Sequence, residues 1–383
     1  MNSYCPAPWM SAEITADGIS PCCWYYPIAS TQQFSNVPDV LNSDEFKDIR
    51  KKMLAGEEIK NCSQCYQLEK YGIESKRKIL LREYGHVTDV KLKYLFLCID
   101  NLCNLKCRGC NSGASHLWYN DELELYGTTY SPKKYSSLEL SNVDQFTNLE
   151  FLEISGGEPL YSKKVEDFLT LLTSRQLEKN INFVLITNGT VKPNENVLKF
   201  MLDSKSLSVA VSIDGVGDLN DYFRSGSNFS TVLETAKYFY SFSDLRDNVT
   251  FQIITTASVY NINELKNIEK LILEQFPKAH WMIKLLEYPT HASIINLPSD
   301  YKKTLLDLME DWGDRYEHLR DALKQTGSEE FSHFINFHES LDNMRNEICP
   351  NQLLNDYIDN YKKINPKVDS KTFFIKHINS LNK

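Results

Sequence analysis

Three closely spaced cysteines are the sharpest chemical signal in the sequence. Cys103, Cys107 and Cys110 occur in the run CNLKCRGC, which directly follows an apolar segment at residues 94–99. Thiolates are the usual protein ligands of iron–sulfur clusters, and three of them leave one iron of a [4Fe–4S] cluster open. An open coordination position lets a metal bind a substrate or cofactor. Structural zinc sites use four ligands, so the spacing favours an open cluster over a zinc loop.

A glycine pair follows the next apolar segment of the chain. Gly156, Gly157, Glu158 and Pro159 come directly after residues 149–154. Glycines let a ligand approach the backbone closely, and the freed N–H and C=O groups can meet a zwitterion. Glu158 would add an anionic acceptor. Gly-Gly alone is first of all a turn, but this pair follows a predicted strand in the same way as the cysteine run.

A second set of cysteines precedes both motifs. It consists of Cys5, Cys22, Cys62 and Cys65. Four thiolates fully ligate a [4Fe–4S] cluster with no open iron, and four equally suit a structural zinc ion. Spacing alone leaves these two alternatives open.

The elements that must position these residues alternate between strands and helices. Six apolar runs separated by amphipathic stretches predict an α/β fold with a parallel sheet and right-handed crossovers. Pattern alone allows a partial barrel or a doubly wound sheet; in barrels, chemistry lies at the carboxyl ends of the strands. The runs are residues 94–99, 149–154, 181–186, 207–213, 249–255 and 281–286, and the helical stretches are residues 163–173, 194–202, 229–240 and 262–276.

Regions before and after this pattern differ from it. Residues 1–90 are rich in cysteine and turn residues, with a hairpin expected around Asp17-Gly18 and a helix opening at Ser43. Residues 291–383 are polar and helical, and residues 301–324 predict the clearest helix there. We therefore expect three domains, at residues 1–90, 91–290 and 291–383.

Taken in order, the two central motifs resemble those of the radical S-adenosylmethionine superfamily. The resemblance covers about residues 91–290 and implies a partial (β/α)6 barrel. It also implies that Cys103, Cys107 and Cys110 hold a [4Fe–4S] cluster that binds S-adenosylmethionine, and that residues 156–159 bind the methionyl amine. The residues implied around the sulfonium, ribose and carboxylate are Thr187, Asn188, Ser212, Asp214 and Arg224. One departure is Gly109, which stands where the family usually has an aromatic residue that packs on adenine.

The N-terminal cysteines resemble the twitch or SPASM-type auxiliary-cluster modules of the same superfamily, which usually follow the barrel. This likeness shifts the balance for the second set from zinc toward an auxiliary [4Fe–4S] cluster. Compared with those modules, the interval from Gly18 to the cysteine ligand is one residue short if Cys22 is the ligand, so Cys23 is an alternative. Alignment on the sequence Pro-Cys-Cys at residues 21–23 favours Cys22.

Composition excludes several classes of protein. Nine of the ten cysteines lie in the first 110 of 383 residues, unlike a short disulfide scaffold bridged along its length. The net charge of −9 does not favour nucleic acid as a partner. No apolar run would span a bilayer, and the N-terminus lacks signal-peptide features, so we expect a cytoplasmic protein without a membrane partner.

The resemblance implies cleavage of S-adenosylmethionine to a 5′-deoxyadenosyl radical, which takes a hydrogen atom from the substrate. We expect the auxiliary cluster to accept an electron, giving oxidation or cross-linking of a peptide, cyclitol or sugar, with an electron donor such as flavodoxin or ferredoxin. One alternative is a redox-neutral epimerase, in which Cys349 is the candidate hydrogen donor. Another is a non-catalytic, metal-stabilised binding protein.

Overall fold

The computed structural model describes most of the chain as two compact units. The described residues are 3–15, 18–25, 27–28, 34, 36–70, 72, 74–130, 140–328 and 331–366. Unit 1 comprises Met1–Leu102, Lys133–Ile186 and Pro193–Ser208, and unit 2 comprises Cys103–Pro132, Thr187–Lys192 and Val209–Lys383.

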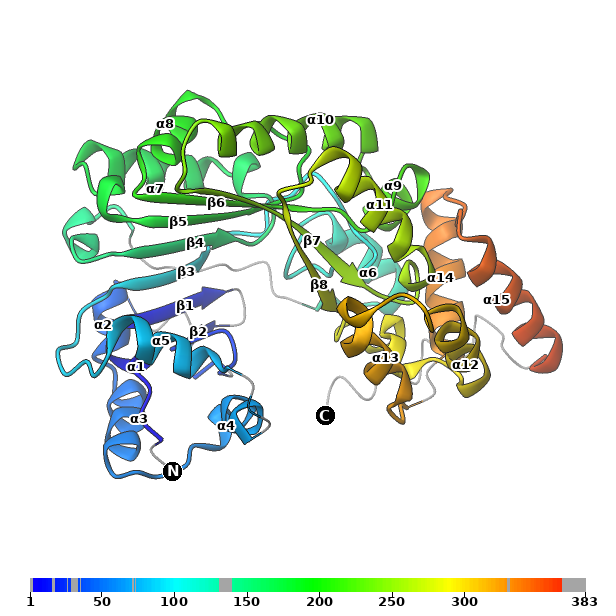
Figure 1. The fold of residues 1–383 in the computed structure, drawn as a ribbon, viewed down its shortest axis with the longest axis horizontal. Helices are drawn as coiled ribbons and strands as arrows, with labels where there is room; N and C mark the ends of the chain where they lie inside the picture. Colours follow the sequence, from blue (N-terminus) through cyan, green and yellow to red (C-terminus); the bar gives the residue numbers. More distant parts are fainter. Residues whose placement is uncertain are drawn as a thin grey trace. The chain divides into compact units, whose positions relative to one another are not determined.

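Unit 1 is built on a sheet with the strand order β2-β1-β3-β4-β5, followed by the first residues of β6 (Figure 1). Its strands are β1 (Ser11–Thr15), β2 (Gly18–Ser20), β3 (Tyr94–Cys98), β4 (Phe151–Ser155), β5 (Asn182–Thr187) and β6 (Ser206–Ser212). The parallel register aligns Ile14, Leu97, Ile154 and Leu185 across four strands. These side chains are buried, and helices α7 (Lys163–Ser174) and α8 (Glu195–Asp203) lie along this part of the sheet (Figure 1).

The N-terminal part of unit 1 adds a hairpin and short helices to this sheet. β1 pairs antiparallel with β2, as the hairpin prediction required, although Asp17 lies outside the described residues. β1 also pairs in parallel with β3, which the sequence did not predict. The predicted helix at Ser43 is α3, and its cap is present because the Ser43 hydroxyl accepts a hydrogen bond from the Phe46 amide. The helices are α1 (Ala7–Met10), α2 (Val37–Leu41), α3 (Asp44–Leu54), α4 (Ser63–Lys70) and α5 (Lys76–Tyr84).

Unit 2 continues the strand and helix alternation. The rest of β6 is followed by β7 (Val249–Ala257) and β8 (His280–Leu285), and β7 and β8 pair in parallel. All six strands expected from the apolar runs are thus present as β3 to β8, and the α/β fold is confirmed. The helices of this part are α6 (Trp118–Tyr126), α9 (Asp218–Phe223), α10 (Phe229–Tyr240) and α11 (Leu265–Gln275).

The C-terminal region of unit 2 is helical, as expected, but one predicted helix is interrupted. The single helix expected at residues 301–324 is wrong, since two helices occupy this stretch. Gly313, in the connection between them, has φ of +86°, a left-handed conformation that glycine adopts readily and that a continuous right-handed helix cannot contain. The helices are α12 (Ser299–Leu308), α13 (Glu317–Lys324), α14 (Phe331–Arg345) and α15 (Gln352–Ile364).

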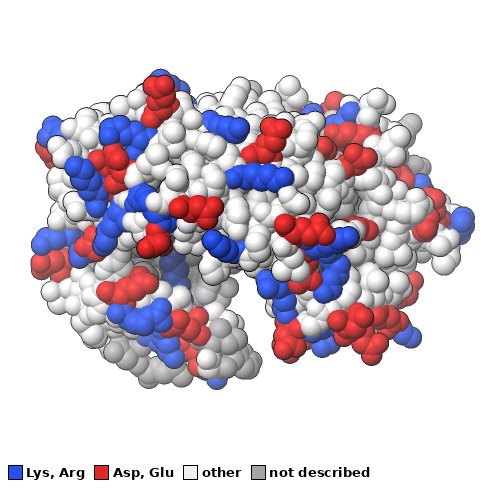
Figure 2. Space-filling view, turned by 45° about the horizontal axis from the view of Figure 1, so that its top comes forward, with Lys and Arg blue, Asp and Glu red and all other residues white. Residues whose placement is uncertain are grey.

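The distribution of surface charge and the lengths of the helices both concern possible partners. Basic and acidic side chains are mixed on the face shown in Figure 2 and do not gather by sign. Within the described part of the chain, no helix has the length and apolar character needed to cross a membrane.

Candidate functional site

The three-cysteine loop lies in unit 2, directly after the chain leaves β3. Cys103 and Cys107 are each 6% exposed and pack with Leu105, and Cys110 packs against them. The backbone holds this loop in place, because the amide of Lys106 donates to Ser225 O at 3.0 Å and that of Arg108 donates to Phe223 O at 2.7 Å. The three thiols therefore lie in one buried loop whose shape is fixed by backbone contacts.

Polar residues from the end of β5 contact this loop. The Asn188 amide nitrogen lies 3.9 Å from Cys103 Sγ and donates to Asn104 Oδ1 at 2.9 Å. The Thr187 hydroxyl accepts from the Gly189 amide. Both residues that the resemblance implied at this strand end thus lie in unit 2 with the cysteine loop, and Asn188 contacts it directly.

The end of β6 contributes a buried ion pair. Ser212 is the last residue of the strand, and Asp214 follows it. One Asp214 oxygen accepts from Arg224 at 2.6 Å, and the other accepts from the Thr256 amide at 2.6 Å. Arg224 Nε is buried without a hydrogen-bond partner among the described residues, so this guanidinium retains a donor for an anionic ligand.

The thiols of Cys107 and Cys110 titrate as a pair. Their shared hydrogen bond lowers the pKa of Cys107 and raises that of Cys110, and the nearby Arg224 guanidinium favours the thiolate form of each. Metal ligation requires thiolates, so a cation beside this pair suits cluster binding.

The glycine motif lies in unit 1 and packs on the chain that leads to Cys103. A Cβ atom on Gly157 would lie 2.2 Å from Leu102 O, and one on Gly156 would lie 2.5 Å from Cys98 Sγ. The amide of Glu158 donates to Leu102 O at 2.7 Å, and its carboxylate accepts from the Leu160 amide at 3.1 Å. Only glycine fits this close approach at either position.

Four cysteines of unit 1 line one small cavity. Cys5, Cys22, Cys62 and Cys65 surround it together with residues that include Lys76 and Arg77. Cys23 is not among its lining residues and is exposed; its thiol lies 3.5 Å from Lys76 Nζ instead. The geometry therefore brings Cys22, rather than Cys23, together with the other three thiols.

The environment of this cavity is largely apolar. Cys5 belongs to a core with Trp9, Met10 and Leu80, and Cys22 and Cys62 pack against it. Burial raises the pKa of Cys5 to about 12 and that of Cys62 to about 11. The groups needed for a four-thiolate site thus line this cavity. Within the described ranges, however, no three His, Cys, Asp or Glu side chains are placed so that they could hold a metal ion.

Cys349, in unit 2, is a member of neither thiol set. It is 5% exposed, burial raises the pKa of its thiol, and Tyr222 hydrogen-bonds to it. Its role as a hydrogen donor stays a prediction.

Arg108, inside the cysteine motif, is a residue that the sequence reasoning missed. Its side chain is fully buried, with its guanidinium carbon 3.7 Å from the Tyr222 ring centroid. It donates to Asp342 at 2.5 Å and to Glu347 at 2.6 Å. The available signal in the sequence was an arginine between candidate metal ligands. Its two partners could not be predicted, because they lie 234 and 239 residues away in the sequence.

The space beside Gly109 is also occupied. A Cβ atom at this position would lie 3.1 Å from Phe223 Cζ and 3.3 Å from Leu286 Cδ1. An aromatic side chain at residue 109 would therefore require these two side chains to shift, which gives a physical reason for the departure noted in the sequence.

Two protein-family models match ranges of the chain that include the two cysteine sets. Residues 98–272 match the model of the Radical SAM superfamily, and residues 5–66 match that of the SPASM iron–sulfur cluster-binding domain. The first range contains the three-cysteine loop and the second contains the four cavity cysteines. The domains imply a [4Fe–4S] cluster that binds S-adenosylmethionine and an auxiliary cluster. None of the curated protein sequences matches the chain.

Solved structures similar to this chain include anSMEcpe with bound AdoMet and Cp18Cys peptide, at 22% identity and a TM-score of 0.38. That match covers 60% of this chain and 61% of the other. SuiB of Streptococcus suis bound to S-adenosylmethionine is 14% identical, with a TM-score of 0.39 over 72% and 59% of the two chains. The chain thus spans about three fifths of the length of these proteins.

The motifs, the gathered thiols and the two family matches agree. The chain carries a radical SAM domain at residues 98–272, preceded by a SPASM iron–sulfur domain at residues 5–66.

Proposed function

We propose that this protein is a radical S-adenosylmethionine oxidoreductase that removes two electrons from its substrate. When bound, the cofactors supply a 5′-deoxyadenosyl radical and an electron acceptor. The substrate would lose a hydrogen atom to the former, and an electron to the auxiliary cluster together with a proton to solvent or a base. The observation that carries the proposal is the pairing of an open set of three cysteines with a closed set of four.

The residues around the three-cysteine loop would bind S-adenosylmethionine. Cys103, Cys107 and Cys110 would ligate the cluster, and the glycine motif at residues 156–159 would bind the methionyl amine. The free Nε of Arg224 suits the methionyl carboxylate, and Asp214 fixes that guanidinium in place. We assign Thr187, Asn188 and Ser212 to the ribose and sulfonium.

The residues around the small cavity would bind the auxiliary cluster. Cys5, Cys22, Cys62 and Cys65 supply four ligands, so no iron stays open to the substrate. Largely apolar surroundings keep water from this site. We propose a peptide, cyclitol or sugar as substrate, flavodoxin or ferredoxin as electron donor, and a reducing cytoplasm that keeps the thiols free.

The test is reconstitution under anaerobic conditions, followed by incubation with dithionite, S-adenosylmethionine and deuterated candidate substrates. About eight irons per chain are expected, since each cluster holds about four. The true substrate transfers deuterium into 5′-deoxyadenosine.

Variants then separate the two sites. Cys65→Ala is expected to form 5′-deoxyadenosine but not the two-electron product, whereas Cys23→Ala retains both. Full yield of oxidised product from Cys65→Ala would exclude an oxidising role for the auxiliary site.

A further inference from the structure

A cavity of about 460 Å³ lies in unit 2 beside the three-cysteine loop. Its volume is in the range of sites for small molecules and cofactors. Cys110 lines one side, so a molecule bound there lies next to a proposed cluster ligand. Apart from Cys110, none of the residues proposed above to hold the cluster and S-adenosylmethionine lines this cavity, as far as the described chain shows.

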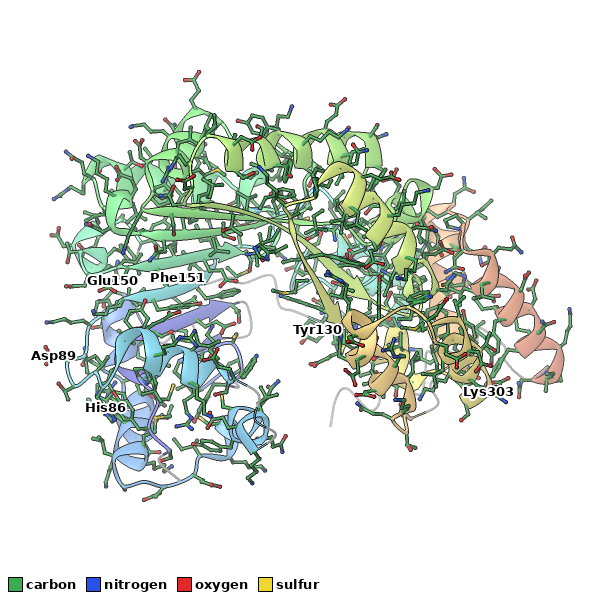
Figure 3. All side chains as sticks on the ribbon, viewed as in Figure 1. His86, Asp89, Tyr130, Glu150, Phe151 and Lys303 are labelled. Atoms are coloured by element: carbon green, nitrogen blue, oxygen red, sulfur yellow. The ribbon has the colours of Figure 1, made fainter. Side chains whose placement is uncertain are left out.

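Aromatic rings make up much of the cavity wall. Seven of its fourteen lining residues carry an aromatic or imidazole ring. The ring centroids of Tyr130 and Tyr288 lie 5.3 Å apart, and each of these residues is 48% exposed (Figure 3 labels Tyr130). The ring of His291 lies 4.4 Å from that of Phe337. Aromatic faces carry partial negative charge and attract cations.

A buried carboxylate lines the same cavity. Glu122 is only 3% exposed. One of its oxygens accepts from the Ser112 amide at 2.7 Å, and the other accepts from the Tyr130 amide at 2.6 Å. These contacts fix the carboxylate but bring no opposite charge.

Two cations near this helix are engaged elsewhere. Lys106 and Arg345 form ion pairs with Asp121, the neighbour of Glu122 on α6. No ion pair found among the described residues includes Glu122. Glutamate is almost never fully buried unless paired, because removing its charge from water is costly.

We propose that this cavity binds a positively charged group of the substrate, an ammonium or guanidinium. Glu122 is its counter-ion, and the rings of Tyr130 and Tyr288 flank it. This inference rests on the proposed function, since it names the substrate class of that reaction. S-adenosylmethionine is also a cation, so the test must separate the two ligands.

The test measures binding by calorimetry on the reconstituted protein, without turnover. The probes are acetyl-lysine methylamide, which is positively charged, and its neutral Nε-acetyl derivative. Only the charged probe is expected to bind, and saturating S-adenosylmethionine is expected to leave its affinity unchanged. Equal binding of both probes overturns the proposal, and so does competition by S-adenosylmethionine, which would assign the cavity to the cofactor.

Variants identify the residues responsible. Glu122→Gln is expected to lower the affinity for the charged probe by about tenfold or more, the effect expected when a hydrogen bond to a charged group is lost. Glu124→Gln, on the exposed face of the same helix, is expected to have no effect. Undiminished affinity in Glu122→Gln would refute the assignment.

Tyr288 provides a second test that does not depend on Glu122. Tyr288→Leu removes a half-exposed ring and is expected to weaken binding about two- to fivefold, whereas Tyr288→Phe keeps the ring and the affinity. Equal affinity of the two variants would contradict a cation–ring contact. Because binding is measured without catalysis, failure of this proposal leaves deuterium transfer intact, and failure of the proposed function leaves these affinities intact.

Discussion

The two cysteine sets are assembled in opposite ways. The three thiols of unit 2 come from one eight-residue loop, whereas the four of unit 1 come from residues 5, 22, 62 and 65. The first set is therefore visible as a motif, while the second needs a hairpin, a core and two helices to bring its members together. The sequence pointed to both sets, but spacing alone favoured a cluster only for the local one; for the dispersed set, the fold shows that the four cysteines share one cavity.

Their electrostatic surroundings differ as well. Beside the loop, the Arg224 guanidinium favours thiolates, and Arg108 adds a second buried cation. Around the small cavity, burial dominates and raises the pKa of all four thiols. The surroundings of the loop thus favour negatively charged thiolates next to a ligand. The surroundings of the four-cysteine cavity exclude water.

The largest effect on activity is expected from a substitution that removes a ligand of one cluster and leaves the other cluster in place. Cys107→Ala removes a ligand of the proposed open cluster, so 5′-deoxyadenosine formation should fall to background while about four irons remain. Iron analysis and chromatography of the products check this. Loss of all iron would instead show that the two sites do not load independently.

Two single substitutions, at Cys22 and at Cys23, test which of these neighbouring cysteines is a cluster ligand in unit 1. Cys22→Ala should lower the iron content by about four per chain and retain 5′-deoxyadenosine formation. Cys23→Ala should keep about eight irons, because its thiol faces Lys76 and not the cavity. The opposite pattern would make Cys23 the ligand.

Much of this comparison could be predicted from the sequence, and the rest depends on distant contacts. The apolar runs predicted β3 to β8, and spacing predicted the three-cysteine loop. The pairing of β1 with β3 was missed because five residues, SAEIT, carry no signal for their partner. The selection of Cys22 over Cys23 depends on the turn after β2, and the cavity that Glu122 lines also needs residues 288–291 and α14.

A third prediction concerns the charge behind the loop. Arg108→Met leaves Asp342 and Glu347 without their buried partner, so the free energy of unfolding should fall by about 3–5 kcal/mol. Urea denaturation of the apoprotein measures this change. Lys324→Met, an exposed ion-pair variant, should stay within about 0.5 kcal/mol. Equal stabilities would mean that the pairs contribute little.

The smallest effect is expected at Glu13 in unit 1. Burial raises its pKa to about 7, with Lys76 opposing and Glu153 adding to the shift. One of its buried oxygens has no hydrogen-bond partner among the described residues. The folded state binds this proton more tightly, so its contribution to stability is full below about pH 4.5 and is lost as the pH rises through about 7.

Glu13→Gln tests this linkage, because glutamine does not titrate. Its stability in urea should decline less than that of the wild type between about pH 5 and 8. Glu45→Gln, on the exposed face of α3, serves as the control. Parallel pH profiles for wild type and Glu13→Gln would contradict the raised pKa.

The ion pairs of Arg108 also set an order of events during synthesis. Asp342 is made 234 residues after Arg108, and Glu347 is made 239 residues after it. At ordinary rates of translation, that delay is on the order of 10–50 s. The cysteine loop is therefore complete long before the carboxylates that neutralise its buried arginine exist. Stable loading of the cluster beside Arg108 should follow release of the C-terminal helices, whereas the cavity of Cys5, Cys22, Cys62 and Cys65 is lined by described residues no later than Leu80.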